Sequence, residues 1–379
     1  MKTSLYKYAF NTWTKYSKNI LNDDLEANLV LCFGNKKILS QNDIYHSINQ
    51  KFRNAEILMC STAGEIYQDS VSDDTMVVTA LQFEKTKFKT SQINIADYEN
   101  SYEAAKSLIN LLPQNDLTYI LVISDGSVVN GSELVKGLND ATNDKVLVTG
   151  GLAGDDANFV STLVGLNEQP STGKIAAIGF YGDNLIVSHG SQGGWDTFGP
   201  ERLVTLSEGN VLFEIDYKNA LELYTKYLGP DAKDLPGSAL LFPLSVIIPG
   251  KNQPVVRTIL SIDNNKNSMT FAGDIPIGSK VRFMKANFDK ISTAASNAAQ
   301  NTLVKQNQNP QFALLISCVG RKLALGSRID EEVESVNELF KNNTLLSGFY
   351  SYGEISPFNE GGSCQLHNQT MTITSFYEL

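Results

Sequence analysis

The sequence has few of the side chains that most often bind transition metals. Its 379 residues include three histidines and four cysteines, and none of these has the local spacing of a zinc site or of a disulfide framework. We therefore expect neither a bound metal ion nor a structural disulfide. Haem is an alternative, because a single axial histidine can hold it without a partner nearby in sequence. His189 and His367 are the candidates for that role.

Long apolar runs are also missing. The longest, residues 239–248, is about half the length that a bilayer span requires, and Pro243 interrupts it. Residues 1–19 contain no uninterrupted apolar segment of the kind found in secretory signals. These two absences predict a cytoplasmic protein without membrane contact.

A third absence is that of clustered positive charge. The 31 Lys and Arg residues are outnumbered by 41 Asp and Glu residues, which gives a net charge of −10. Binding to a phosphate backbone needs clustered Lys and Arg, so we expect no nucleic-acid partner. The composition is otherwise that of an ordinary globular protein, with 42% hydrophobic and 19% charged residues.

What the sequence does contain is one pattern repeated three times. Each copy has an apolar strand, a polar turn, a helix, a second strand, and a loop of small residues that includes a carboxylate. The first strands of the three copies are predicted at residues 29–34, 120–126 and 313–320. About 30 residues separate the end of each first strand from the end of its loop, which is the length of one right-handed βαβ crossover. Amphipathic helices are predicted before each copy, at residues 5–20, 102–112 and 288–303.

The region between the second and third copies differs from the repeats. Residues 188–202 are glycine-rich, which predicts an irregular boundary segment or lid. Residues 203–285 contain short alternating runs separated by Pro, Gly and Asn, which predict an inserted antiparallel β region. We therefore predict an α/β fold of repeated βαβ units with mixed sheets, in two closely packed halves. Residues 1–200 hold two α/β repeats, and residues 201–379 hold the β insertion and the third repeat.

The three loops are the candidate ligand-binding segments, because functional loops cluster at strand ends. Backbone N–H groups of glycine-rich turns can face an anion while a nearby carboxylate binds an ammonium group, which would suit an amino-acid zwitterion. The other interpretation is that Glu65, Asp155 and Glu354 are turn residues that cap nearby backbone, and the sequence leaves both open. The loop residues that we single out as ligand-binding are Ser61, Thr62, Gly64, Glu65, Gly151, Gly154, Asp155, Tyr350, Tyr352, Gly353 and Glu354.

Aromatic and cationic side chains add to this set. Tyr350 and Tyr352 would point to one side of an extended segment, where their rings either line a pocket or pack as half-buried residues. Arg282 alternates with apolar neighbours, so it is either an inward-facing cation that complements an acidic ligand or a surface residue.

Ser351 raises the question of catalysis. It lies two residues before Gly353, as in a nucleophile elbow, but Phe349 stands where that motif has its first glycine. We therefore do not expect an enzyme. Ester hydrolysis at Ser351 is the catalytic alternative.

Specific motifs occur in both halves of the chain. The second half contains GFYSYGEISP at residues 348–357 and LHNQTMTITSF at residues 366–376, and the first half contains CSTAGEI at residues 60–66 and TGGLAGDD at residues 149–156. These motifs resemble the C-terminal and N-terminal signatures of FIST-domain proteins. Two further segments resemble parts of the FIST C region, so the resemblance covers nearly the whole chain; they are residues 204–229 and 273–283.

The resemblance implies a cytosolic sensory module of signal transduction that binds a small ligand, for which amino acids are often suggested. A subset of similar proteins binds haem and responds to nitric oxide through a partner histidine kinase or cyclic-dinucleotide enzyme. The family's recurring Tyr-Gly-Glu and His-Asn-Gln sequences fall on residues 352–354 and 367–369, which adds His367 and Asn368 to the candidate ligand-binding residues.

We therefore predict a non-enzymatic small-molecule sensor without a resident cofactor, which acts on a separate signalling protein. Its ligand is predicted to be an amino acid or a similar small polar metabolite. The alternative is a haem-based nitric-oxide sensor.

Overall fold

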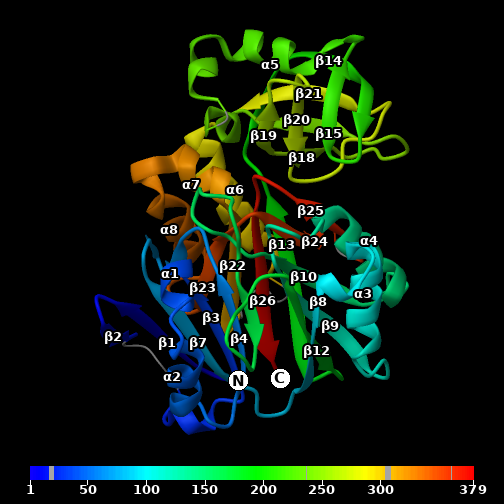
Figure 1. Cartoon of the computed structure of the whole chain (residues 1–379). Helices are drawn as coiled ribbons and strands as arrows, with labels where there is room; N and C mark the ends of the chain where they lie inside the picture. The colour runs from blue at the N-terminus through cyan, green and yellow to red at the C-terminus, as the bar shows by residue number, and fades with distance from the viewer. Residues whose placement is uncertain (17–20, 236, 304–308, 360) are drawn as a thin grey trace.

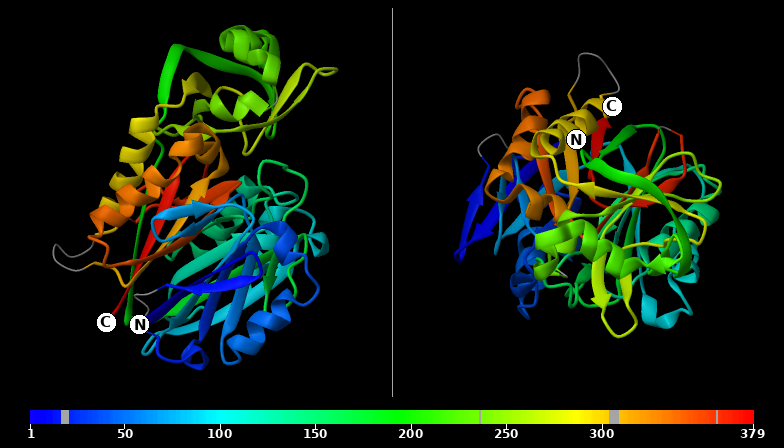
Figure 2. Two further views of the ribbon diagram at one scale, coloured as in Figure 1. Left: turned by 90° about the vertical axis from the view of Figure 1, so that its left-hand side faces the viewer. Right: turned by 90° about the horizontal axis from the view of Figure 1, so that it is seen from above.

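The computed structural model describes residues 1–16, 21–235, 237–303, 309–359 and 361–379. Three six-stranded mixed sheets form a core, and a smaller antiparallel β domain covers one end of it (Figure 1). Both termini lie at the opposite end of the core, as the side views in Figures 1 and 2 show. Within the described residues, no helix combines the length and the apolar character needed to cross a bilayer.

Each core sheet is built around four strands of its own, and the arrangement of these four strands is the same in all three sheets. Two parallel strands come from a βαβ unit, a third strand pairs antiparallel with the first of them, and a fourth lies beyond the third. In the first sheet these are β3 (Leu29–Gly34), β4 (Glu56–Ser61), β7 (Met76–Gln82) and β1 (Lys2–Ala9), with β2 (Thr12–Lys15) at the edge. In the second they are β9 (Leu117–Ser124), β10 (Leu147–Leu152), β12 (Lys174–Tyr181) and β8 (Lys87–Asn94). In the third they are β22 (Phe312–Cys318), β23 (Leu345–Ser351), β26 (Met371–Glu378) and β13 (Leu185–Gln192).

The remaining edge strands are exchanged between the repeats in a ring. The first repeat lends β5 (Glu65–Tyr67) and β6 (Ser70–Ser72) to the third sheet, where β5 pairs with β23. The third repeat lends β24 (Gly353–Pro357) and β25 (Cys364–His367) to the second sheet, where β24 pairs with β10. The second repeat lends β11 (Val164–Leu166) to the first sheet beside β4. The predicted α/β fold with repeated units and mixed sheets is confirmed, and this exchange is a feature that the sequence did not predict.

Helices cover the outer face of each core sheet (Figure 1). They are α1 (Lys36–Leu39) and α2 (Ile44–Lys51) on the first sheet, α3 (Ser101–Asn110) and α4 (Gly131–Thr142) on the second, and α6 (Phe288–Asn301), α7 (Val319–Leu325) and α8 (Asp330–Leu339) on the third. In β3, Leu31 and Phe33 face the interior that the three sheets share, whereas Val30 and Cys32 pack under the helices. Because both faces of such strands are buried, they read in the sequence as continuous apolar runs.

The small domain occupies residues 196–285 and has a core of its own, which includes Val204, Tyr224 and Phe283. Its strands are β14 (Asp196–Glu208), β15 (Val211–Ile215), β16 (Lys218–Asn219), β17 (Leu244–Ile247), β18 (Val255–Arg257), β19 (Ile259–Asp263), β20 (Ser268–Phe271) and β21 (Lys280–Lys285), with helix α5 (Ala220–Leu228). Within the described residues, these strands pair only in the antiparallel sense, as the sequence predicted.

The helix predicted at residues 5–20 is wrong. Residues 2–15 form a β-hairpin instead, and residues 17–20 lie outside the described residues. Phe10 and Asn11 have φ angles of 50° and 60°, which suit a tight hairpin turn. Leu5 and Tyr6 are buried on opposite faces of β1. Because both faces of this strand carry apolar side chains, its sequence lacks the alternation of a half-exposed strand and resembles a helical pattern. The helices predicted at residues 102–112 and 288–303 are confirmed as α3 and α6.

The prediction of an irregular segment at residues 188–202 is also wrong. Strand β13 continues to Gln192 and β14 begins at Asp196. A side-chain Cβ at Gly190 would lie 2.1 Å from the Ala298 carbonyl oxygen. Glycine at this position therefore lets α6 approach the strand and does not mark a break in regular structure.

Candidate functional site

The three repeated loops meet at the ends of their strands. Ala63 N donates to the Tyr350 carbonyl over 2.8 Å, and Tyr350 N donates to the Gly64 carbonyl over 2.8 Å. Gly154 N donates to the Ser61 carbonyl over 2.9 Å, and Ser61 Oγ donates to the Gly154 carbonyl over 2.7 Å. The structure thus brings the predicted loops together, through direct contacts between their backbones.

Glu65 is fully buried in the first loop. Its carboxylate accepts hydrogen bonds from Thr75 N at 3.2 Å and Thr75 Oγ1 at 2.7 Å, and from Thr62 Oγ1. Thr75 directly precedes β7, so Glu65 fixes its loop to the start of the third strand of its own repeat. Burial raises the pKa of Glu65 to about 7, against the lowering effect of these hydrogen bonds.

Glu354 makes the same contacts in the third loop. It is fully buried, and it accepts from Ser351 Oγ at 2.6 Å, Thr370 N at 3.2 Å and Thr370 Oγ1 at 2.9 Å. Burial raises the pKa of Glu354 to about 8. Thr370 directly precedes β26, so Glu354 also fixes a loop to a strand. Ser351, the candidate nucleophile, is itself fully buried and donates its hydroxyl to this carboxylate.

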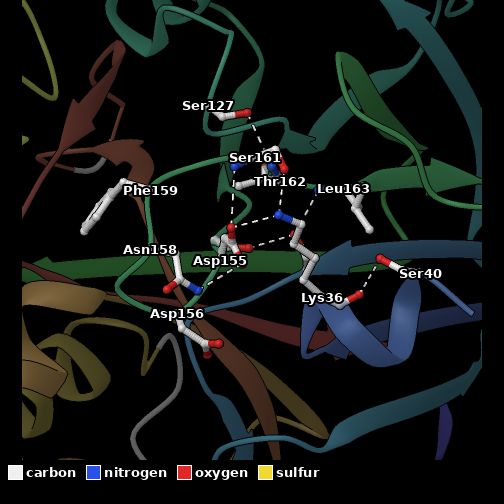
Figure 3. Close-up of polar contacts among 12 residues, drawn as sticks. Lys36, Ser40, Ser127, Asp155, Asp156, Asn158, Phe159, Ser161, Thr162 and Leu163 are labelled. Carbon is white, nitrogen blue, oxygen red and sulfur yellow. Dashed lines mark hydrogen bonds and ion pairs between the residues drawn. The ribbon is translucent and has the colours of Figure 1, made fainter.

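Asp155 in the second loop has different partners (Figure 3). Its Oδ2 lies 2.9 Å from Lys36 Nζ, and Lys36 Nζ also lies 2.6 Å from Ser161 Oγ. Asn158 Nδ2 donates to the other carboxylate oxygen of Asp155 over 3.4 Å. Lys36 begins α1 of the first repeat, so this ion pair joins two repeats. The Lys36 side chain is 26% exposed and that of Asp155 7%, so the lysine is the more exposed partner of this pair.

A second lysine lies on the other side of the first loop. Lys322 Nζ donates to the Ala63 carbonyl over 2.7 Å and forms an ion pair with Asp73. Burial raises the pKa of Asp156, and the charge of Lys322 opposes this shift. Asn35 Nδ2 donates to Asp156 Oδ2 over 3.2 Å. Charged groups of both signs therefore surround the junction of the loops.

The loop glycines permit this close packing. Gly64 has a φ angle of 136°, and a Cβ there would lie 2.8 Å from Lys322 Nζ. A Cβ at Gly154 would lie 2.7 Å from Ala63 N. Cβ atoms at Gly151 and Gly353 would lie 2.8 Å and 2.9 Å from methyl groups of Ile316 and Leu366. The φ angle at Gly64 and the close packing at the other three positions account for glycine there.

The two loop tyrosines face different surroundings. Tyr350 is fully buried and donates its hydroxyl to Glu332, which forms a buried ion pair with Arg321. Tyr352 accepts a hydrogen bond from Phe159 N over 3.0 Å, and the two rings stack with centroids 4.4 Å apart. Tyr352 also lines a cleft between the core and the small domain.

Arg282 is not near the three loops. It lies on β21 in the small domain, where Val281 and Phe283 point into the core and leave Arg282 exposed on the opposite face. Its Nη2 donates to the Gly199 carbonyl over 3.3 Å. The register of β21 therefore makes this arginine a surface residue.

His367 does not fit the role of a haem ligand. It is 2% exposed, its Nε2 lies 2.8 Å from the Ser356 carbonyl oxygen, and Phe358 packs edge-on against its ring. Burial lowers the pKa of His367 to about 4, so the ring is neutral at pH 7. A porphyrin has no approach to a ring nitrogen that is committed in this way.

His189 lies on β13 beside a cavity of about 500 Å³. Asp144, Lys145 and Asn301 share the lining of this cavity with apolar side chains. A haem pocket needs an extended apolar surface on both faces of the ring, so these residues do not fit haem either. Among the described residues, no three His, Cys, Asp or Glu side chains are grouped as metal ligands.

Asn368 is fully buried in the turn between β25 and β26. Neither polar atom of its side chain has a hydrogen-bond partner within the described part of the chain. The neighbouring Gln369 reaches the small domain, because its Nε2 donates to Thr258 Oγ1 and to the Leu240 carbonyl, each over 3.0 Å. Gln369, directly after Asn368, thus belongs to the contact between the core and the small domain.

Three residues of the site, Lys36, Phe159 and Ser161, were not predicted from the sequence. Lys36 could have been predicted, because it lies two residues after β3. Residues that follow the carboxyl ends of neighbouring parallel strands lie close together at one edge of the sheet. Phe159 and Ser161 follow the second loop in a segment without periodicity, and no pattern distinguished them.

Sequence comparison identifies the two halves of the chain. The FIST N domain matches residues 28–218, and the FIST C domain matches residues 220–357. No curated protein matches the sequence.

Two solved structures have a weak likeness to this fold. The "Crystal structure of cyanuic acid hydrolase from A. caulinodans" is 6% identical, with 100% of this chain and 99% of that chain covered and a TM-score of 0.34. "Cyanuric acid hydrolase: evolutionary innovation by structural concatenation" is 7% identical, with the same coverage and a TM-score of 0.30. A structural likeness this weak says nothing about the activity of this chain. The family matches are decisive: the chain belongs to the FIST family, whose domains are sensory domains of signal transduction.

Proposed function

We propose that this protein senses a small polar metabolite, with free amino acids as the first class to test, at the junction of Lys36, Asp155 and Ser161. The observation that supports this proposal is that Asp155 has a different role from Glu65 and Glu354. Glu65 and Glu354 each hold the start of a strand, whereas Asp155 pairs with a partly exposed lysine of another repeat. Asp155 is therefore the loop carboxylate that a ligand can engage without unfolding a strand.

A zwitterion matches the charges of this junction. Its carboxylate would replace Asp155 at Lys36 Nζ, and its ammonium group would bind Asp155, with Ser161 Oγ as a further hydrogen-bond partner. The pair is largely buried, so opening it without replacement partners would cost about 3–5 kcal/mol. The ligand would then supply both counter-charges.

Binding here would be transmitted along residues 155–161. Asp155 begins this segment, and Phe159 N within it donates to Tyr352 at the cleft beside the small domain. A ligand that displaces Asp155 favours a second arrangement of the segment only by its differential affinity for the two arrangements. We propose that a separate cytoplasmic signalling protein, such as a histidine kinase or cyclic-dinucleotide enzyme, reads that change.

A binding role is favoured over catalysis by the state of Ser351. Its hydroxyl is buried and donates to Glu354, so it is neither accessible to an ester nor next to a base that is free to accept its proton. The sensor proposal accordingly includes no turnover of the ligand.

Thermal melting with the standard amino acids and their deaminated analogues tests the proposal. We expect at least one amino acid to raise the melting temperature, and Lys36→Met and Asp155→Asn each to abolish the rise while the fold survives. Glu201→Gln is the control, because Glu201 makes an exposed ion pair with Lys280 at 3.0 Å in the small domain. A rise that persists in both junction variants would remove Lys36 and Asp155 from the site.

A further inference from the structure

A cleft of about 440 Å³ lies between the core and the small domain. Its size is within the range of small-molecule sites. Both parts of the protein contribute to its walls: residues 126–131, Phe159 and Tyr352 on the core side, and Asn210, Ser261 and residues 270–273 on the small-domain side.

The cleft is electrically neutral. None of its described lining residues carries a charged side chain, although 19% of the whole sequence is charged. Asp125 lies behind the core wall, but it is fully buried and its oxygens accept from Ser127 N at 2.6 Å, Val128 N at 3.0 Å and Gly173 N at 2.8 Å. A charged ligand would lose hydration in this cleft without gaining a counter-charge.

An aromatic pair forms part of the core wall. Phe159 and Tyr352 stack at 4.4 Å with an angle of 21° between their planes. Phe159 has a φ angle of 54°, a left-handed conformation that bulky residues rarely adopt. The hydrogen bond from Phe159 N to Tyr352 Oη, 3.0 Å long, holds it there. Residues in such conformations are frequent at ligand clamps, where the strain positions a side chain.

Neutral hydrogen-bonding groups surround the aromatic pair. Asn130 uses Oδ1 to cap α4, accepting from Ser132 N at 3.0 Å and Glu133 N at 3.2 Å, and its amide NH₂ is a donor at the cleft. Asn210 uses Nδ2 to donate to the Phe271 carbonyl over 2.8 Å, and its Oδ1 is an acceptor. The hydroxyl groups of Ser261 and Thr270 add further donors and acceptors from the small domain.

We infer that this interdomain cleft is a second ligand site, which binds an uncharged planar heteroaromatic molecule. The ligand stacks on the Phe159–Tyr352 pair, and the amides and hydroxyls of both walls bind its edge. This site differs in chemistry from the Lys36–Asp155 junction, which suits a charged ligand, and it does not depend on that junction. Because the ligand contacts both walls, its binding stabilises the arrangement of the small domain on the core.

Isosteric pairs that differ only in charge test the ligand class. Nicotinamide and orotamide are the uncharged probes, and nicotinate and orotate are their anionic counterparts. Binding is measured by isothermal titration calorimetry and by saturation-transfer NMR. We expect at least one uncharged probe to bind ten-fold or more tightly than its anionic counterpart. Equal binding of both members of each pair, or no binding of either uncharged probe up to its solubility limit, overturns the inference.

Variants locate the binding. We expect Phe159→Ala to weaken binding of the uncharged probe ten-fold or more through loss of the stacking surface. Ser261→Trp should abolish it by filling the cleft from an exposed position of β19. Val160→Ala is the matched control, because Val160 is 73% exposed next to Phe159 and does not line the cleft. Full binding in both Phe159→Ala and Ser261→Trp contradicts the inference.

Discussion

Single residues decide which loop carboxylate is available to a ligand. The three loops read alike in the sequence, with a small residue, a glycine and an acid, so the sequence predicted Glu65, Asp155 and Glu354 as one set. Their partners are what separate them, and these partners are remote in sequence: Thr75 and Thr370 precede later strands, and Lys36 belongs to another repeat. The positions of the candidate residues were thus predictable, but their individual roles were not.

Glu354 should make stability depend on pH. Its pKa is about 8 in the folded protein, against 4.5 as the usual value, so the folded state keeps a proton that the unfolded state releases. Stability therefore falls as pH rises from about 4.5 to about 8. In Glu354→Gln, which cannot ionise, we expect a smaller loss of unfolding free energy between pH 5 and pH 9, measured by urea denaturation. Glu208→Gln, at an exposed position, is the control. Parallel pH profiles for Glu354→Gln and the unmodified protein would contradict the assignment.

The buried ion pair between Arg321 and Glu332 should contribute strongly to stability. Arg321 Nε and Nη2 lie 2.9 Å and 2.6 Å from Glu332 Oε2, and both side chains are fully buried. Arg321→Met leaves a buried carboxylate without its counter-charge, which should cost about 3–5 kcal/mol of unfolding free energy in chemical denaturation. Arg328→Met removes an exposed pair with Glu331 and should cost about 0–1 kcal/mol. Similar losses in the two variants would be inconsistent with this account.

At the scale of elements, the sequence predicted the repeated strands and helices better than the segments between them. The βαβ units have strong periodicity and were found correctly. The hairpin at residues 2–15 was not, because β1 is buried on both faces and its apolar residues imitate a helical pattern. The lending of β5 and β24 to neighbouring sheets depends on contacts between residues far apart in the sequence, which no local pattern records.

The packing of α6 on β13 depends on one glycine. A Cβ at Gly190 would meet the Ala298 carbonyl oxygen at 2.1 Å, so Gly190→Ala should push the helix away from the strand. We expect a loss of about 1–3 kcal/mol, typical of overpacking, measured as a lower midpoint of denaturation. A Cβ at Gly193, in the same segment, would have its nearest neighbours 3.6 Å away, so Gly193→Ala should change stability by less than about 0.5 kcal/mol. An equal effect at both positions would argue against a steric cause.

At the scale of the whole molecule, the two family regions are not two structural units. The boundary between the FIST N and FIST C matches, at residues 218–220, lies inside the small domain, between β16 and α5. The sequence predicted two closely packed halves, and it could not predict that strands pass between the repeats on either side of this boundary.

Cutting the chain at this boundary should therefore prevent folding. A fragment of residues 220–379 has β23 without β5, β24 without β10 and β26 without β13, so it exposes unpaired sheet edges. We expect the separate fragment to lack the dispersed amide spectrum of a folded protein in NMR. Co-expression with residues 1–219 should restore it in a complex. A folded, monomeric 220–379 fragment would show that the strand exchange is dispensable.

The ring of exchanged strands also determines where this molecule can move. Each repeat lends edge strands to one neighbour and receives edge strands from the other. A shift of one repeat would therefore break hydrogen bonds with both neighbours. The small domain lies outside this ring. It is joined to the core where the chain leaves β13 and returns into α6, and by the hydrogen bonds of Gln369 and Arg257. We therefore expect a stimulus received at the loops to change the position of the small domain more readily than the arrangement of the three core sheets.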